Sequence, residues 1–359
     1  MSEEVAPAEN IKFGLITLHD ENSSYDKNFI VATQEACEKL GVELVIKTNI
    51  PEGQECYDAA VDLADQGCDI IFADSFGHEP YMIEAAEDYS DVQFCHATGY
   101  QAQIVNLPNY QNAFAAIYEG RYLAGIVAGM KLNEMIENGE ITEDQAVMGY
   151  VGAFDYAEVI SGYTSFYLGA RSVCPSVTMK VIYTGSWYDE TLEKEGANAL
   201  IGKGCVLISQ HADSMGAPSA CELAGVPDVS YNMSMLSACP NTYLVSSKIN
   251  WEPYVEYIIG CVRNGEDIET DWTGTIKTGS VELTEFNDAI IADGTKEIVD
   301  AAMNAMNAGT LHVFDTSTFT VDGKPLEEDN YVFDGYFHES ELGSAPAFAY
   351  YIDGITILD

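Results

Sequence analysis

The chain is poor in basic residues. It has 15 lysines and arginines against 58 aspartates and glutamates, which gives a formal net charge of −43. Nucleic-acid binding needs Lys and Arg to neutralise phosphates, and docking on anionic lipid needs basic segments, so this balance excludes both kinds of partner. It permits a neutral or cationic ligand and favours solubility in crowded or salty surroundings. A halophilic origin would explain the same numbers.

The cysteines show no spacing that is typical of metal binding or of a disulfide framework. There is no C-x-x-C pair and no zinc-ligand spacing. Most of them lie inside apolar periodic runs, where a free cysteine acts as a small hydrophobic residue. We therefore expect core residues, no metal site, and a reducing or anaerobic setting. The nine are Cys37, Cys56, Cys68, Cys95, Cys174, Cys205, Cys221, Cys239 and Cys261.

No apolar run approaches the length of a membrane-spanning helix. Met1–Asn10 also lacks the basic and apolar regions of a signal peptide, and we interpret it as a flexible acidic leader. Two origins stay open for this leader. It is either a native cytoplasmic start or the tether that remains after removal of a signal segment.

Recognisable catalytic motifs are absent. The sequence has no dinucleotide-binding glycine fingerprint, phosphate-binding P-loop, zinc-protease helix or nucleophile elbow. His78 and His211 fall at predicted strand-to-helix turns, and His211 with Asp213 is a candidate acid/base pair. Polar ligand contacts or loop-ordering hydrogen bonds are the alternative role for these residues. We predict no catalytic residue and no cofactor, and we expect a binding protein rather than an enzyme.

The chain alternates regularly between strands and helices. Its 359 residues suggest two domains. Strands such as Ile11–Leu18 alternate with helices such as Asn28–Leu40, and the pattern restarts at Val147. A long helix from Asn112 to about Met130 carries a small-residue stretch that predicts close packing. Single helices between strands imply right-handed βαβ units, so the predicted fold is α/β with two doubly wound parallel-sheet lobes.

Two strand-to-helix turns combine an aromatic residue with a carboxylate. Tyr25–Phe29 and Gly185–Asp189 each follow a strand and open a helix, one in each half of the chain. Ligands of open α/β sheets lie outside the carboxyl ends of the strands, and aromatic rings stack on planar ligands. The turns therefore predict an aromatic site for one flat ligand. The alternative is that these rings only pack against the ends of their own helices and contact no ligand.

Five segments, in the right order, resemble motifs of one known family. They are Asp26–Phe29 (D-K-S-F), Tyr118–Gly125 (E-G-x-L-A-G), Met148–Gly152 (G-F-V-G-G), Gly185–Asp189 (G-S-[FW]-x-D) and Lys194-Glu195 (K-E). This is the basic membrane protein family of substrate-binding lipoproteins of ABC transporters, which includes purine-nucleoside receptors. The resemblance extends from about Lys12 to Leu358. Three later segments are more similar to a branch associated with free purine bases such as adenine: Ser209–Ser214, Asn250–Tyr254 and Asp271–Gly274.

The resemblance implies a bilobed type I periplasmic-binding-protein fold with hinge crossovers, closing on its ligand. It places lobe 1 at 10–106 plus about 248–285, and lobe 2 at 107–247 plus about 286–318. The turn signals at 322–325 and the many aromatic residues of the tail predict a C-terminal hairpin and tail at 319–359, packed on the lobes. It further implies a monomeric, extracytoplasmic, membrane-anchored lipoprotein. Such a protein delivers a purine nucleobase or nucleoside to a membrane permease.

The resemblance also implies the ligand-binding residues. Phe29 and Trp187 would stack on the two faces of the ring between the lobes. The other candidates would make polar contacts or wall the site: Asp26, Phe76, Asp155, Tyr188, His211, Asp213, Asn232 and Lys248.

Three positions depart from the nucleoside-receptor pattern. Asn232 replaces a ribose-binding Asp, Lys248 falls one position early in its motif, and Ile30 replaces an Asn. A weakened ribose clamp favours a free base or another planar heterocycle such as a flavin. Two other classes stay open: an enzyme acting on nucleosides, and a cytoplasmic ligand sensor of the same fold.

Overall fold

The computed structural model describes residues 10–327 and 330–358, so the predicted leader lies outside the described residues except for Asn10. The chain divides into two compact units. Unit 1 comprises the described part of Met1–Ala115, with Asn250–Ser280 and Gly343–Ala345. Unit 2 comprises Ala116–Ile249 and the described parts of Val281–Leu342 and Pro346–Asp359. The chain thus passes from one unit to the other several times.

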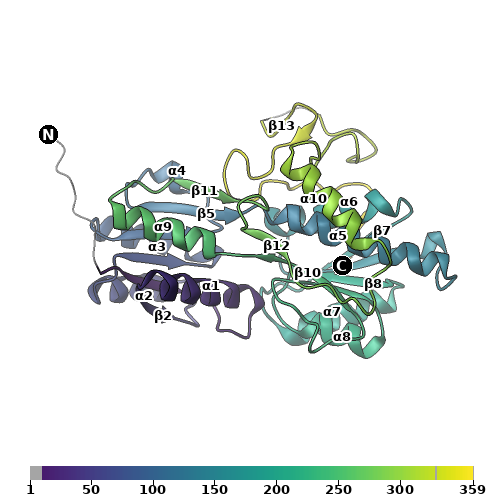
Figure 1. Ribbon diagram of the computed structural model, residues 1–359, viewed down its shortest axis with the longest axis horizontal. Helices are drawn as coiled ribbons and strands as arrows, with labels where there is room; N and C mark the ends of the chain where they lie inside the picture. Colours follow the sequence, from purple (N-terminus) through teal and green to yellow (C-terminus); the bar gives the residue numbers. More distant parts are fainter. Residues whose placement is uncertain (1–9, 328–329, 359) are drawn as a thin grey trace. The chain divides into compact units, whose positions relative to one another are not determined.

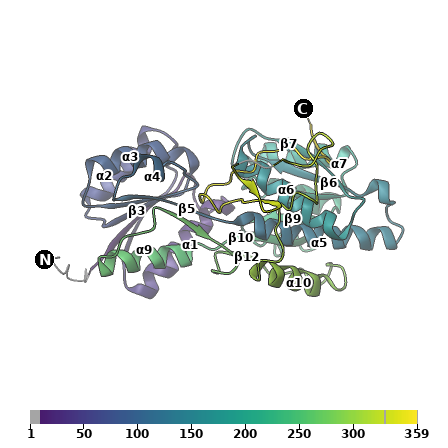
Figure 2. The ribbon, with the colours of Figure 1, turned by 90° about the horizontal axis from the view of Figure 1, so that it is seen from above.

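Unit 1 is a parallel sheet covered by helices on both faces. Its strand order is β11-β5-β4-β3-β1-β2, and all pairs are parallel. Helices α1 and α9 lie on one face, and α2 and α3 on the other (Figure 2). The elements are β1 (Lys12–Ile16), α1 (Ser24–Leu40), β2 (Glu43–Lys47), α2 (Gln54–Asp65), β3 (Ile70–Ala73), η1 (Phe76–His78), α3 (Glu79–Asp88), β4 (Gln93–Ala97), α4 (Ala102–Val105), β5 (Tyr110–Ala115), α9 (Glu252–Asn264) and β11 (Asp271–Gly274).

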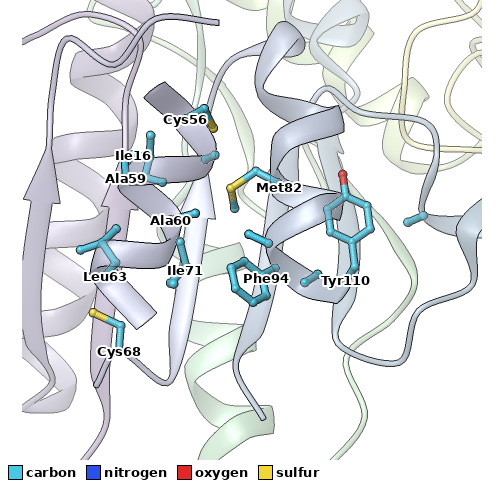
Figure 3. Packing of buried hydrophobic residues seen from close by; sticks show 14 residues of the cluster. Ile16, Cys56, Ala59, Ala60, Leu63, Cys68, Ile71, Met82, Phe94 and Tyr110 are labelled. Atoms are coloured by element: carbon cyan, nitrogen blue, oxygen red, sulfur yellow. The ribbon is translucent and has the colours of Figure 1, made fainter. Parts of the chain in front are cut away.

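The unit 1 core lies between the sheet and these helices. Ile71 and Phe94 from the sheet pack with Leu63 of α2 and Met82 of α3, all of them fully buried (Figure 3). Gly14 of β1 permits this approach, because a Cβ there would lie 2.9 Å from Leu63 Cδ1. The cysteines occupy buried positions: all nine are buried and free, which confirms the prediction that they are core residues.

Unit 2 repeats this architecture. Its sheet order is β12-β10-β9-β8-β6-β7-β15, parallel except for β12. Helices α5 and α6 lie on one face, and α7 and α8 on the other (Figure 1). The elements are α5 (Ile117–Glu137), η2 (Glu143–Gln145), β6 (Val147–Gly152), α6 (Ala157–Val173), β7 (Thr178–Tyr183), α7 (Glu190–Gly202), β8 (Leu207–Gln210), α8 (Gly216–Ala224), β9 (Asp228–Tyr231), β10 (Tyr243–Ile249), β12 (Val281–Leu283), α10 (Thr295–Asn307), β13 (Val332–Phe333), β14 (Tyr336–Phe337) and β15 (Ile355–Ile357).

The small residues of α5 allow close helix packing, as predicted. A Cβ on Gly125 would lie 2.0 Å from the Phe166 carbonyl oxygen of α6. The predicted start of this helix is wrong, however, because Tyr110–Ala115 forms strand β5 and α5 begins only at Ile117. Pairing of β5 with both β4 and β11 outweighs the local helical pattern. Unit 1 therefore extends to Ala115, beyond the predicted boundary at 106.

The C-terminal segment packs by aromatic contacts and joins unit 2, except for Gly343–Ala345. Phe314 and Phe348 stack with ring centroids 4.3 Å apart, and β13 pairs with β14 as a short hairpin. Strand β15 then extends the unit 2 sheet beside β7. Across the described residues, no helix is both long enough and apolar enough to cross a membrane.

The central strand orders match, β2-β1-β3-β4-β5 in unit 1 and β7-β6-β8-β9-β10 in unit 2. This confirms the predicted α/β fold with two doubly wound parallel sheets. In such sheets the order reverses beside the first strand, and ligands bind outside the carboxyl ends there. The carboxyl ends of β1 and β3, and of β6 and β8, are therefore where a site is expected.

Candidate functional site

Phe29 lies in the core of unit 1 and not at the carboxyl ends of its strands. Its side chain is 0% exposed. The ring stacks on Trp251, with centroids 4.3 Å apart and planes 27° apart, and Phe72 packs at 5.5 Å. The prediction that Phe29 stacks on a ligand is therefore wrong in this structure. Helix α1 begins at Ser24, so Phe29 lies one turn inside the helix, over the sheet.

Asp26, in contrast, lies at the carboxyl end of β1. Its Oδ1 accepts a hydrogen bond of 2.7 Å from the His19 N–H, and its Oδ2 accepts one from the Ser23 hydroxyl. The side chain is almost fully buried. Burial alone would raise the pKa of Asp26, but the hydrogen bonds from His19 and Ser23 hold this pKa below its ordinary value. Asp26 is therefore an ionised carboxylate that orders the turn after β1.

Asp74, which is not among the predicted site residues, lies beside Asp26 at the end of β3. Its Oδ1 accepts a hydrogen bond from the Leu18 N–H at 3.1 Å, and its carbonyl accepts one from the Tyr25 hydroxyl at 2.9 Å. Burial and the nearby Asp26 charge raise the pKa of Asp74 well above its ordinary value. The pKa values of these two buried carboxyl groups are thus shifted in opposite directions. The signal that could have found Asp74 is its position directly after a buried strand.

Phe76 follows in η1, and its ring is 41% exposed. It lies 6.4 Å from the Tyr100 ring in a stacked arrangement. Glu52 fixes the loop by accepting hydrogen bonds from the Ser75 hydroxyl and the Gly77 N–H. Phe76 is therefore an accessible aromatic residue close to the expected site of unit 1.

Trp187 and Tyr188 lie in the turn between β7 and α7 of unit 2, and both are half-buried. The Phe154 ring lies edge-on to the indole, with ring centroids 5.2 Å apart and planes at 67°. The Tyr156 ring is tilted against the indole, with centroids 6.1 Å apart. Among the described residues, no ring stacks flat on Trp187. The Tyr188 carbonyl accepts a hydrogen bond from Ser186 Oγ, which holds the turn. The indole is thus contacted by two rings, neither of which stacks flat on it.

Glu193 joins two of the predicted turns of unit 2, and the sequence analysis missed it. Its carboxylate accepts hydrogen bonds from the Asp189 and Ser214 N–H groups. The N–H of Asp213 donates to the Trp187 carbonyl at 2.9 Å. Burial raises the pKa of Glu193 to about 7. One buried carboxyl group therefore fixes Trp187 and Asp213 next to each other.

Asp155, after β6, is held by two tyrosines. Its Oδ1 accepts hydrogen bonds from the Tyr183 hydroxyl at 3.1 Å and from the Tyr351 hydroxyl at 2.7 Å. Tyr351 lies near the end of the chain, so the C-terminal segment reaches this edge of the unit 2 sheet. Asp155 therefore has a clear part in ordering unit 2, and its predicted ligand contact stays a prediction.

His211 does not form the candidate acid/base pair with Asp213. Its Nε2 lies 3.4 Å from Glu158 Oε1, and its Nδ1 lies 3.3 Å from the Tyr150 hydroxyl. Burial, and next the Arg121 charge, lower the pKa of His211 to about 4. A neutral, fully buried imidazole with both nitrogens engaged is a structural residue.

Asn232 orders the backbone, whereas Lys248 forms a partly exposed ion pair. Asn232 has a left-handed backbone, with φ of 62°, and its Oδ1 accepts a hydrogen bond from the Ile249 N–H. Lys248 forms an ion pair with Glu282 at 2.8 Å across the β10–β12 pair. The structure therefore does not bring Lys248 to the turns that carry Trp187 and Asp213.

Arg121 on α5 is a further residue that the sequence analysis missed. It is buried beside the ends of β8 and β9, and its Nη1 donates a 2.6 Å hydrogen bond to the Gln210 carbonyl. Its guanidinium carbon lies 3.6 Å from the centre of the Tyr231 ring. The signal was an arginine within an otherwise small and apolar stretch, in a chain with few basic residues.

Across residues 10–327 and 330–358, no cluster of three His, Cys, Asp or Glu side chains could hold a metal ion. The ends of the strands instead offer buried hydrogen-bonding groups and aromatic rings. Such groups can bind a planar organic ligand by stacking and by contacts to its polar atoms.

Comparisons with known proteins identify the family of the chain. The model of the Bmp family, described as ABC transporter substrate-binding protein PnrA-like, matches residues 16–310. A purine-binding protein of Brucella abortus is 32% identical over 286 residues, covering 79% of this chain and 77% of that protein. TsgA13 of Haloferax volcanii, provisionally named an ABC transporter glucose-binding protein, is 34% identical over 281 residues, covering 78% of this chain and 66% of that protein.

A solved structure supports the fold. An ABC transporter solute-binding protein from Aeropyrum pernix superposes with a TM-score of 0.71 at 17% identity, covering 85% of this chain and 93% of that one. Substrate-binding proteins of this family are extracytoplasmic, bind small molecules and deliver them to permeases. With the family model matched over most of the chain, this protein belongs to the Bmp family of ABC transporter substrate-binding proteins.

Proposed function

We propose that the chain binds a purine, as a nucleobase or a nucleoside, and delivers it to the permease of an ABC importer. The observation that carries this proposal is Trp187, a half-buried indole at the carboxyl end of β7 with no ring stacked flat on it among the described residues. Stacking of a base on an aromatic residue contributes about 1–3 kcal/mol. The name of the Brucella abortus relative supports the same ligand class.

A free base is favoured over a nucleoside. The two positions that depart from the ribose clamp are engaged elsewhere, Lys248 with Glu282 and the Asn232 oxygen with the Ile249 N–H. In unit 2, Asp213 is the carboxylate that we propose for a polar contact to the ligand, with Tyr188 as a wall. The predicted ligand contacts of Asp26 and Phe76 in unit 1 stay predictions. The prediction that one ligand contacts both units stays a prediction, as do the lipid anchor and the monomeric state.

Binding without chemical change is part of the proposal. The histidine of the candidate acid/base pair is neutral and engaged with Glu158 and Tyr150. Incubation with inosine or adenosine is therefore expected to leave the nucleoside intact. Release of free base during that incubation would contradict this part.

Glucose is the second candidate, because the Haloferax volcanii relative carries that ligand in its name and aromatic residues also stack on sugars. A thermal-shift screen with purine bases, nucleosides, riboflavin and glucose separates the candidates. A ligand at 100 times its Kd stabilises the folded state by about 2.7 kcal/mol, so a clear rise in Tm is expected with a purine. A rise with glucose alone would contradict the proposal.

A further inference from the structure

Arg121 is a buried cation without an ionic partner. Its side chain is 1% exposed, and it makes no ion pair with any described residue. Its protein contacts are one hydrogen bond to the Gln210 carbonyl and the faces of two tyrosine rings, Tyr231 at 3.6 Å and Tyr150 at 5.8 Å from the guanidinium carbon. Burial of a charge is costly unless the charge is paired and hydrogen-bonded. The fold of unit 2 therefore leaves this guanidinium incompletely satisfied.

Two of the guanidinium nitrogens, Nε and Nη2, are buried and have no hydrogen-bond partner among the described residues. These two N–H groups lie along the same edge of the planar group, whereas Nη1, which contacts Gln210, lies on the other side. An edge with two parallel donors matches two adjacent acceptor atoms in a bidentate contact. The two unpaired donors could therefore both be satisfied by one group with two neighbouring acceptor atoms.

The position of Arg121 agrees with ligand recognition. Gln210 and Tyr231 are the last residues of β8 and β9, at the carboxyl end of the unit 2 sheet. Ligands of doubly wound folds bind outside this end. The Tyr231 hydroxyl is also buried without a partner, and so is the hydroxyl of Ser247, its register neighbour on β10. Unpaired groups thus gather on the face of the sheet that α5 covers.

We infer that Arg121 determines which purine binds, by pairing its Nε and Nη2 groups with the C6 carbonyl oxygen and N7 of a 6-oxopurine. This inference rests on the proposed function. Arginine makes the same bidentate contact to the O6 and N7 atoms of guanine in DNA. Adenine presents a donor amino group in place of O6, so it would oppose the guanidinium. The ligand class is therefore hypoxanthine, guanine or xanthine, and adenine is disfavoured.

The first test uses the unmodified chain and calorimetric titration with hypoxanthine, adenine and unsubstituted purine. Hypoxanthine is expected to bind about 10- to 100-fold more tightly than either of the others, the discrimination of one bidentate pair. Adenine binding as tightly as hypoxanthine, or more tightly, would overturn this inference and leave the proposed function intact. Failure of every purine to bind would overturn both.

The second test compares Arg121→Met with Arg171→Met. Arg171 on α6 also lies over a tyrosine ring, Tyr167, at 6.0 Å, but it is only partly buried. Arg121→Met is expected to lose about 10- to 100-fold in hypoxanthine affinity and to keep its adenine affinity, and Arg171→Met to retain both. An equal loss for both bases would indicate a merely structural role and overturn the inference. The titrations on the unmodified chain decide the question if Arg121→Met does not fold.

Discussion

The two sheets share one strand order, but the carboxyl ends of their strands carry different chemistry. In unit 1 these ends are lined by the buried acids Asp26 and Asp74, with His19 beside them. In unit 2 they carry the indole of Trp187 and the buried guanidinium of Arg121. The strand order fixes where ligand-binding groups can gather, and the turns after the strands decide which groups they are.

The same contrast separates two aromatic residues. Phe29 is enclosed by Trp251 and Phe72 inside unit 1, whereas the rings that contact Trp187 among the described residues lie edge-on or at a tilt. A ring whose face is covered by a protein ring contributes to stability, and a ring with an uncovered face can contribute to binding. The following predictions test these contrasts, beginning with the largest expected effect.

Phe29→Ala is expected to lower the free energy of unfolding by about 3–5 kcal/mol, because it opens a cavity in the unit 1 core. Urea denaturation measures this loss. Trp187→Ala is the matched control. It is expected to lose much less free energy of unfolding, since the Trp187 side chain is half-buried. A Phe29→Ala variant that has the stability of the parent but no longer binds ligand would contradict this assignment and indicate that Phe29 contacts the ligand.

Glu193→Gln tests the buried acid of unit 2, whose pKa is raised to about 7. Between pH 4.5 and 7 the folded protein keeps this proton while the unfolded chain has lost it, so the parent loses stability as pH rises. Glutamine does not titrate. The free energy of unfolding of the variant is therefore expected to rise relative to that of the parent across this window, by up to roughly 3 kcal/mol. Parallel pH–stability curves for the two proteins would contradict the raised pKa.

Asp26→Asn and Asp74→Asn compare the two acids of unit 1 by the same substitution. Asp26 is ionised and accepts charge-assisted hydrogen bonds, so its loss is expected to cost about 1.5–3 kcal/mol at pH 7. The pKa of Asp74 is raised, and an amide resembles its protonated form, so a smaller cost is expected there. The Asp26 contribution should decline as pH falls, because its pKa is lowered in the folded state. Equal costs for both variants would contradict the opposite directions of these two pKa shifts.

Trp187→Ala is expected to weaken purine binding by about 1–3 kcal/mol, since it removes the stacking surface. Trp187→Phe, which keeps a ring, should retain part of the affinity. Calorimetric titration measures both, and circular dichroism confirms that the fold is unchanged. Full affinity in the alanine variant would place the ligand away from this indole.

Lys248→Ala is expected to have the smallest effect. Its ion pair with Glu282 is partly exposed, and such pairs contribute about 0–1 kcal/mol. Ligand affinity is expected to stay within about twofold of the parent. A loss of tenfold or more would give Lys248 the ligand contact that its position in the structure does not support.

The fold could be predicted from the sequence because its signals are local. Buried strands such as β1 contain continuous apolar runs, here the buried residues 13–16, and Gly41 ends α1 in a left-handed conformation. The start of α5 could not be predicted, since β5 depends on pairing with β11, which lies more than 150 residues further along the chain. Local pattern alone does not contain such pairings.

The candidate site could be predicted only in part. Trp187 lies in the turn after β7 and Asp26 in the first turn of α1, and the start of a helix after a strand marks the carboxyl end of a sheet directly. The burial of Phe29 depends on Trp251, and the engagement of Asp155 depends on Tyr351, so neither follows from nearby residues. Arg121 was missed for the same reason, because its contact with Gln210 joins two distant elements.

The measurement that tests the central claim most directly is calorimetric titration of the unmodified chain with hypoxanthine and, separately, with glucose. The account predicts saturable binding of one hypoxanthine per chain and no heat of binding with glucose. Binding of glucose without binding of any purine would contradict it.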